Sequence, residues 1–185
     1  MINFAILGTG RIGQVHARAV AGNEKARLRA VADPIAAASD AVASRHGCDV
    51  GTIDEIAASD DVDAVVICTP TDTHADLIEQ FVGKGKAVFC EKPIDLDANR
   101  VRACLDVVDR ESGFLMVGFN RRFDPHFMAV KQAISDGKVG TPELAIITSR
   151  DPGAPPLDYI NRSGGIFRDM TIHDFDMAMF LMGEM

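Results

Sequence analysis

The sequence contains no tryptophan and only one tyrosine, so aromatic stacking on nucleic-acid bases is not expected to be its main task. Positive charge is also in short supply, and the formal net charge at pH 7 is -8. Because a polyphosphate backbone is repelled by such a chain, a nucleic-acid partner is not expected. A small molecule that is neutral or carries one negative charge remains open as a ligand.

Long apolar runs are missing as well. No stretch approaches the roughly 20 residues that cross a bilayer, and the residues after Met1 lack the basic start of a signal peptide. We therefore expect a cytoplasmic protein with no membrane partner. No two cysteines form a CxxC pair, which favours buried, reduced thiols over disulfides. The cysteines are Cys48, Cys68, Cys90 and Cys104.

Short apolar runs alternate with stretches of helical periodicity over the first 120 residues or so. This alternation predicts a parallel sheet with helices on both faces. Right-handed crossovers then give an α/β fold with a doubly wound, Rossmann-type sheet, which binds ligands at the carboxyl ends of its strands. The predicted strands are 3–7, 27–32, 63–68, 87–90 and 115–117, and the predicted helices are 11–22, a segment ending near 45, 52–58, 73–83 and 96–111.

The pattern changes after this region. The expected elements are a helix over 125–136, a longer strand over 142–149, an irregular Pro- and Gly-rich loop over 151–165 and a helix over 167–182. The strand has no obvious later strand to pair with. We therefore expect residues 1–120 to form an NAD-binding Rossmann domain. Residues 121–185 would be the N-terminal part of an incomplete α+β substrate domain.

A phosphate-binding loop is predicted directly after the first strand, where Gly8-Thr9-Gly10-Arg11-Ile12-Gly13 fits the pattern GxGxxG. Glycines allow the tight turn and the close approach of a pyrophosphate, and the following helix offers unpaired N–H groups. Asp33 ends the next strand, where its carboxylate can accept hydrogen bonds from a ribose diol. That carboxylate would repel the 2′-phosphate of NADP, and residues 34–37 are uncharged, so NAD is expected.

Several segments together resemble one family, the glucose-fructose oxidoreductase/inositol dehydrogenase (Gfo/Idh/MocA) family, and most closely its inositol 2-dehydrogenase members. They are GTGRIGQVHA at 8–17, CTPTDTHAD at 68–76, EKPIDLD at 91–97, VGFNRRFDP at 117–125 and GGIFRDMTIHDFDMA at 164–178. The resemblance implies NAD-dependent oxidation of a secondary alcohol of a cyclic polyol or sugar. The expected reaction converts myo-inositol to 2-keto-inositol.

The resemblance also implies roles for individual residues. Lys92 would stand between nicotinamide and substrate, and Asp169 and His173 would face it. Further contacts to the cofactor, or to the cleft that it shares with the substrate, are implied for residues near strand ends and at the start of the second domain. They are Thr69, Thr71, His74, Glu91, Asn120 and Arg121.

The chemistry agrees with these residue types. Oxidation of an alcohol releases a hydride to the cofactor and a proton to a base. Asp169 and His173 stand at i and i+4, hence on one helix face about 5–6 Å apart, which suits an oriented histidine base. The ammonium of Lys92 could hold the substrate hydroxyl and favour the alkoxide. The division of proton transfer between lysine and histidine stays open.

Other interpretations remain. Asp169, His173, Asp174 and Asp176 cluster in sequence, but a second histidine or a thiolate at ligand spacing is missing, so no metal is expected. Members of the family are nearly twice as long as this chain, and full-length relatives are expected to be homo-oligomers. The chain could therefore be a truncated dinucleotide-binding protein without turnover, or another sugar dehydrogenase of the family. Which polyol it uses is also open.

Overall fold

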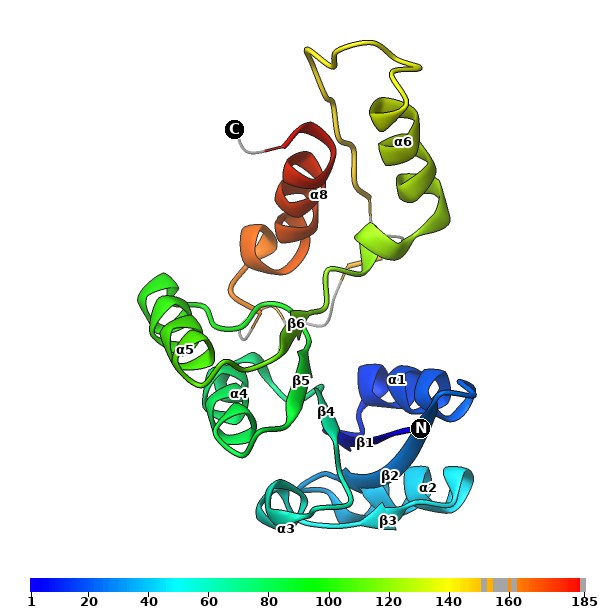
Figure 1. Cartoon of the computed structure of the whole chain (residues 1–185), viewed down its shortest axis with the longest axis vertical. Coiled ribbons are helices and arrows are strands. Elements are labelled where there is room, and N and C mark those ends of the chain that lie inside the picture. Colours follow the sequence, from blue (N-terminus) through cyan, green and yellow to red (C-terminus); the bar gives the residue numbers. More distant parts are fainter. Residues whose placement is uncertain (151–152, 155–159, 161–162, 184–185) are drawn as a thin grey trace. The chain divides into compact units, whose positions relative to one another are not determined.

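The computed structural model describes residues 1–150, 153–154, 160 and 163–183. The chain divides into two compact units, Met1–Gly118 and Phe119–Met185, which are described separately below. Figure 1 shows the strands and their flanking helices in the first unit, and helices α6 (Pro125–Ser135) and α8 (Ile172–Met182) in the second. In the described part of the chain, no helix combines the length and apolar character that a bilayer crossing requires.

The first unit contains six parallel strands in the order β3-β2-β1-β4-β5-β6. This is the doubly wound order, with its reversal between β1 and β4, and it confirms the predicted Rossmann fold. The two-residue strand β3 was not predicted. The strands are β1 (Ile2–Leu7), β2 (Ala26–Ala32), β3 (Asp49–Val50), β4 (Ala64–Ile67), β5 (Ala87–Cys90) and β6 (Leu115–Val117).

Five helices cover the two faces of this sheet, as Figure 1 shows. Buried residues of α1 and α2 share one core cluster, and those of α3, α4 and α5 share the other. All five helices were expected, and their bounds differ from the predictions by a few residues. They are α1 (Arg11–Ala21), α2 (Ala36–His46), α3 (Ile53–Ala58), α4 (His74–Val82) and α5 (Ala98–Arg110), with a short 3-10 turn, η1 (Thr71–Thr73), before α4.

The apolar runs in the sequence arise because both faces of the sheet are covered. Successive side chains of a strand point to opposite faces. Accordingly, Ala5 and Leu7 of β1 lie in the core beneath α3, α4 and α5, whereas Ile6 lies in the core beneath α1 and α2. In β4, Val65 and Val66 divide between the two cores in the same way.

Local capping residues set the ends of several helices. Thr52 and Glu55 form a reciprocal capping box at the start of α3, in which the Thr52 N–H donates to the Glu55 carboxylate at 2.8 Å. The carboxylate of Asp97 accepts the Asn99 N–H at 2.8 Å and begins α5. Gly47 ends α2 with a φ of 69°, in the left-handed region that favours glycine.

The second unit contains a 3-10 turn η2 (Asn120–Phe123), helix α6 (Pro125–Ser135), a π-helical turn η3 (Phe167–Thr171) and helix α8 (Ile172–Met182). Asp124 caps α6, whose first residue is proline. The guanidinium of Arg122 donates to both carboxylate oxygens of Asp176 at 2.6 to 3.0 Å, which ties η2 to α8. Asp176 is buried at 7% exposure, so this pairing supplies hydrogen-bond partners that water cannot.

The predicted strand over 142–149 is wrong. This stretch forms no strand, and no described segment pairs with it. A strand needs a partner for its backbone N–H and C=O groups, and an apolar sequence alone does not supply one. Leu144 and Ile146 are accordingly 79% and 83% exposed. Most of the loop predicted over 151–165 lies outside the described residues.

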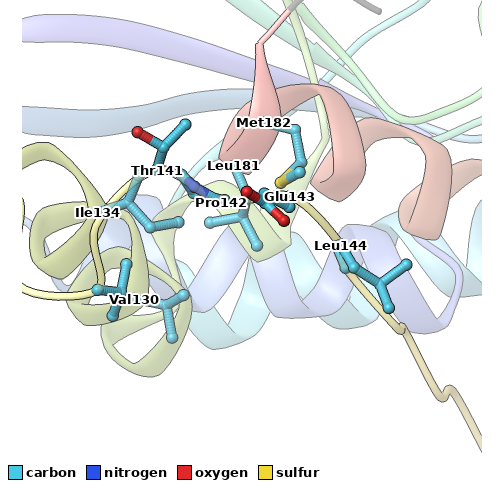
Figure 2. A pocket seen from close by; sticks show the side chains of 10 residues that line it. Val130, Ile134, Thr141, Pro142, Glu143, Leu144, Leu181 and Met182 are labelled. Atoms are coloured by element: carbon cyan, nitrogen blue, oxygen red, sulfur yellow. The ribbon is translucent and has the colours of Figure 1, made fainter.

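The same stretch contributes to a hollow of about 490 Å³ in the second unit. Figure 2 shows Val130 and Ile134 of α6 on one side of the hollow and Leu181 and Met182 of α8 near Pro142. The lining is mostly apolar and includes none of the predicted site residues. The hollow therefore belongs to the packing of this unit.

We expect Phe81→Ala to lower the free energy of unfolding by about 3–5 kcal/mol, because the ring is fully buried beneath the sheet and its loss leaves a cavity. Phe114→Ala is the matched control, since Phe114 is 69% exposed and its removal should cost less than about 1 kcal/mol. Urea denaturation measures both values. Equal losses for the two variants would contradict this description of the core.

Candidate functional site

The carboxyl ends of four strands in the first unit lie side by side. Leu7 of β1 is in register with both Ala32 of β2 and Ile67 of β4, and Ile67 is in register with Cys90 of β5. The residue after each of these ends is therefore brought to one edge of the sheet, where doubly wound folds bind ligands. The predicted site residues that meet at this edge belong to the loop 8–13, Asp33, Thr69, Glu91 and Lys92.

Two glycines of the loop are required by the fold itself. Gly8 has a φ of +87°, and a Cβ there would lie 2.7 Å from the carbonyl oxygen of Cys68. A Cβ on Gly13 would lie 1.9 Å from the carbonyl oxygen of Gly8. Both distances are far below van der Waals contact, so any side chain would force the backbone to move.

Gly10 is different, because its φ of -63° suits any residue and a Cβ at this position would have no described atom within 4 Å. The fold alone does not require glycine there, which indicates room kept for a ligand. Gly10 is also the N-cap residue of α1, where no described side chain caps the helix and the first turn carries no acidic residue. The unpaired N–H groups favour an anion. Arg11, with its side chain exposed, and Ile12, half-buried, are the first two residues of this helix.

Asp33 follows β2 and is held by three hydrogen bonds. Its carboxylate accepts the Thr9 N–H at 2.6 Å, the Thr9 hydroxyl at 3.0 Å and the Ile35 N–H at 2.9 Å. Partial burial alone would raise the pKa of Asp33, but these bonds favour the ionised form and hold the pKa below its usual value. The side chain therefore presents a fixed negative charge beside the glycine loop.

The segment after β4 contains Thr69, Thr71 and His74. The hydroxyls of Thr69 and Thr73 lie 2.7 Å apart, and Thr71 begins the 3-10 turn η1. His74 is only 2% exposed, and its two ring nitrogens lie 2.8 Å from the carbonyl oxygens of Pro93 and Thr69. The His74 side chain thus contacts the segments after β4 and β5, and its expected contact with the cofactor stays a prediction.

Glu91 and Lys92 follow β5, and both are half-buried. An oxygen of the Glu91 carboxylate lies 2.7 Å from Nε2 of His16, a residue for which the sequence predicted no role. Its position in the sequence could have indicated a role, because His16 follows Gly13 by three residues and so lies on the same face of α1 as that buried glycine. A Cβ on Gly118 would lie 3.1 Å from the Glu91 carboxylate, so glycine also makes room there.

All four cysteines, each in the described part of the chain, are free thiols. Cys68 lies at the strand ends, directly before Thr69. Burial, together with the nearby charge of Glu91, raises the pKa of Cys68 to about 12. Burial also raises the pKa of Cys90. These thiols are therefore neutral at physiological pH.

In the second unit, Arg121 is bound by two partners. Its guanidinium forms an ion pair with Asp174 and donates to the hydroxyl of Ser149 at 3.1 Å. The Ser149 hydroxyl donates to the same carboxylate at 2.5 Å. Burial opposes the charge of Asp174, but these two hydrogen bonds hold its pKa below the usual value. Asn120 precedes Arg121 and is exposed.

Asp169 and His173 lie on the predicted helix, but its first turn is π-helical. The N–H of Asp169 donates to the carbonyl oxygen of Gly165 at 3.0 Å. The ring of Phe119 meets the His173 ring edge-on, with 6.5 Å between centroids. Both residues are half-buried. Their expected catalytic roles stay predictions, and a π turn at this position is a feature that functional sites often share.

Two of the carboxylates that cluster in sequence near His173 form ion pairs with arginines. Asp174 binds Arg121, and Asp176 binds Arg122. Within the ranges that the structure describes, no group of three or more histidine, cysteine or acidic side chains is placed to hold a metal ion.

Two family models match the chain. Residues 2–119 match the model described as "Oxidoreductase family, NAD-binding Rossmann fold", of the GFO_IDH_MocA family. Residues 127–185 match the model described as "GFO/IDH/MocA C-terminal domain". The first match agrees with the glycine loop and Asp33, and it confirms the expectation of an NAD-binding Rossmann fold.

Individual relatives give the same result. The chain is 70% identical over 183 residues to inositol 2-dehydrogenase of Rhizobium meliloti strain 1021, covering 99% of the chain and 56% of that protein. It superimposes with a TM-score of 0.93 and 46% identity on the crystal structure of a myo-inositol dehydrogenase from Corynebacterium glutamicum, covering 98% of this chain and 55% of that one.

A third relative was solved with ligands. The crystal structure of scyllo-inositol dehydrogenase from Lactobacillus casei with bound cofactor NAD(H) and scyllo-inositol matches with a TM-score of 0.87 and 32% identity. The match covers 99% of this chain and 56% of that one. The chain thus spans about half the length of the relatives that it matches.

The two kinds of glycine in the loop should respond differently to substitution. Gly10→Ala should leave the melting temperature unchanged but weaken NAD binding by about tenfold or more, because the methyl group occupies only the space kept for the ligand. Gly13→Ala should lower both the melting temperature and the affinity for NAD, because its methyl group collides with the backbone of Gly8. Thermal unfolding and calorimetric titration with NAD measure the two effects. An unchanged affinity in Gly10→Ala would contradict the assignment of the loop.

Proposed function

Because this chain belongs to the GFO/IDH/MocA oxidoreductase family, we propose that it serves the NAD-dependent oxidation of a secondary alcohol on a cyclic polyol. The expected substrate is myo-inositol and the expected product is 2-keto-inositol. Support comes from the relative named inositol 2-dehydrogenase at 70% identity, and from the relative solved with NAD(H) and scyllo-inositol. In this proposal residues 1–120 form the cofactor domain, and residues 121–185 the first part of the substrate domain.

One observation supports the proposal most directly. The glycine loop, the ionised Asp33 and the segment of Glu91 and Lys92 all lie at the aligned carboxyl ends of β1, β2 and β5. The room at Gly10 and the unpaired N–H groups of α1 suit a pyrophosphate, and the fixed carboxylate of Asp33 suits a ribose diol. The residues present therefore fit NAD.

Several other predicted site residues have a proposed contact with the cofactor or with the cleft that it shares with the substrate. Thr69 and Thr71 would line its path across the end of β4, and Glu91 would lie near the nicotinamide ribose. Asn120 and Arg121 would line the cleft shared by nicotinamide and substrate. When bound, NAD supplies the acceptor for the hydride that leaves the alcohol carbon.

The protein itself must stabilise the alkoxide and accept the proton. In this proposal the ammonium of Lys92 donates a hydrogen bond to the substrate hydroxyl oxygen and stabilises the negative charge that develops there. The imidazole of His173 accepts the proton, and the carboxylate of Asp169 orients the imidazole and stabilises its charged form. Homo-oligomer formation and a cytoplasmic location remain predictions from the sequence and its resemblance.

A second candidate is a dinucleotide-binding protein without turnover. Incubation with NAD and a panel of cyclic polyols separates the two candidates, because only turnover produces the absorbance of NADH. Binding of NAD without NADH formation would favour the second candidate.

We expect Lys92→Ala to lower the rate of NADH formation from myo-inositol by about 10²-fold or more, since the variant lacks the ammonium that stabilises the alkoxide. Its dissociation constant for NAD should change by less than about threefold. Lys84→Ala, at an exposed lysine of the same unit, is the control and should match the wild type. Equal losses of rate and NAD affinity in Lys92→Ala would indicate a structural lysine instead.

Cofactor choice should depend on Asp33. NADP should bind about tenfold or more weakly than NAD, because its 2′-phosphate would meet the negative charge of this carboxylate. Asp33→Asn keeps an acceptor for the Thr9 N–H but removes the charge. The variant should therefore show a smaller difference between its affinities for NAD and NADP. Titration with both dinucleotides tests this expectation, and tighter binding of NADP by the unchanged protein would refute it.

A further inference from the structure

The two chain neighbours of Lys92 are each held by a histidine. His16 contacts the side chain of Glu91 at 2.7 Å, and His74 contacts the main-chain carbonyl of Pro93 at 2.8 Å. His16 belongs to α1 and His74 to α4, which cover opposite faces of the sheet. The segment that carries Lys92 is therefore attached to helices on both faces.

His74 lies between two loop segments of the first unit. Its two ring nitrogens each lie 2.8 Å from a carbonyl oxygen, of Thr69 and of Pro93. The ring is only 2% exposed, so water has little access to either contact. His74 thereby joins the segment after β4 to the segment after β5.

The contact made by His16 confines the Glu91 carboxylate. The His16 ring also packs on Phe89, with 5.1 Å between ring centroids, so its orientation is set from a second side. A Cβ on Gly118 would come within 3.1 Å of the carboxylate, so the backbone at Gly118 leaves the Glu91 side chain little room to move on that side. The Glu91 side chain is thus held in place by a partner and by limited space.

We propose that His16 and His74 are positioning residues that fix the segment Glu91–Lys92–Pro93, and through it the ammonium of Lys92. This inference rests on the proposed function, in which that ammonium holds the substrate hydroxyl. Displacement of a reacting group by about 1 Å is enough to lower a rate by roughly 10²-fold. Loss of either histidine should therefore affect turnover more than it affects cofactor binding.

The test uses the full-length gene product, with paired variants at each histidine. His74→Phe keeps a ring but removes both ring nitrogens, whereas His74→Asn keeps an amide nitrogen near the position of Nδ1. His16→Leu removes the contact to Glu91, and His16→Gln keeps an amide that can reach it. His126→Leu is the control, because the His126 side chain is exposed on α6.

We expect His74→Phe to lower kcat for myo-inositol by about 10²-fold and His16→Leu by about tenfold, with NAD affinity within about threefold of wild type. The Asn and Gln variants should recover part of kcat. Variants that keep full kcat while folded would overturn the proposal, as would kcat and NAD affinity that fall together. If His74→Phe does not fold, the His16 pair and His74→Asn still decide the outcome.

A further measurement does not depend on activity. Hydrogen exchange of the Lys92 amide should be faster in His16→Leu than in wild type, and unchanged exchange would count against positioning. If the wild type shows no polyol turnover while exchange responds as expected, the proposed function fails and the attachment of the segment stands.

Discussion

The parallel strands of the first unit remain paired one residue beyond their ends, and the geometry of the site depends on this pairing. The N–H groups of Gly8, Cys68, Glu91 and Gly118 each donate to the last residue of a neighbouring strand, at 2.7 to 3.0 Å. These bonds fix the first residue of the loops that follow β1, β4, β5 and β6 relative to the sheet. The starts of the phosphate-binding loop and of the lysine segment are therefore set by backbone hydrogen bonds.

Most of this fold could be predicted because its signals are local or periodic. Buried parallel strands give unbroken apolar runs, and the resemblance to the GFO/IDH/MocA family is confirmed by family models that match both parts of the chain. Strand β3 was not predicted because it has two exposed residues and no apolar run. The prediction for 142–149 was wrong because its composition favours a strand, although strand formation depends on a partner that composition does not reveal.

The site could be predicted only in part, for a related reason. The glycines and Asp33 follow strands at fixed spacings, so their positions can be derived from the sequence. The contacts of His16 and His74 join residues 75 and 19 positions apart, and they exist only once the sheet has brought β1, β4 and β5 together. The same holds for Arg121 and Asp174, which are 53 positions apart. Such pairings leave no periodic or spacing pattern to detect.

The raised pKa of Cys68 has a consequence for the chemical durability of the strand ends. Peroxides and alkylating reagents attack the thiolate form of cysteine, and a thiol with a pKa of about 12 supplies almost none of it at neutral pH. The fold thus places a sulfur atom beside a proposed redox cofactor while keeping it unreactive. Oxidants should therefore react with Cys68 far more slowly than with a thiol of ordinary pKa.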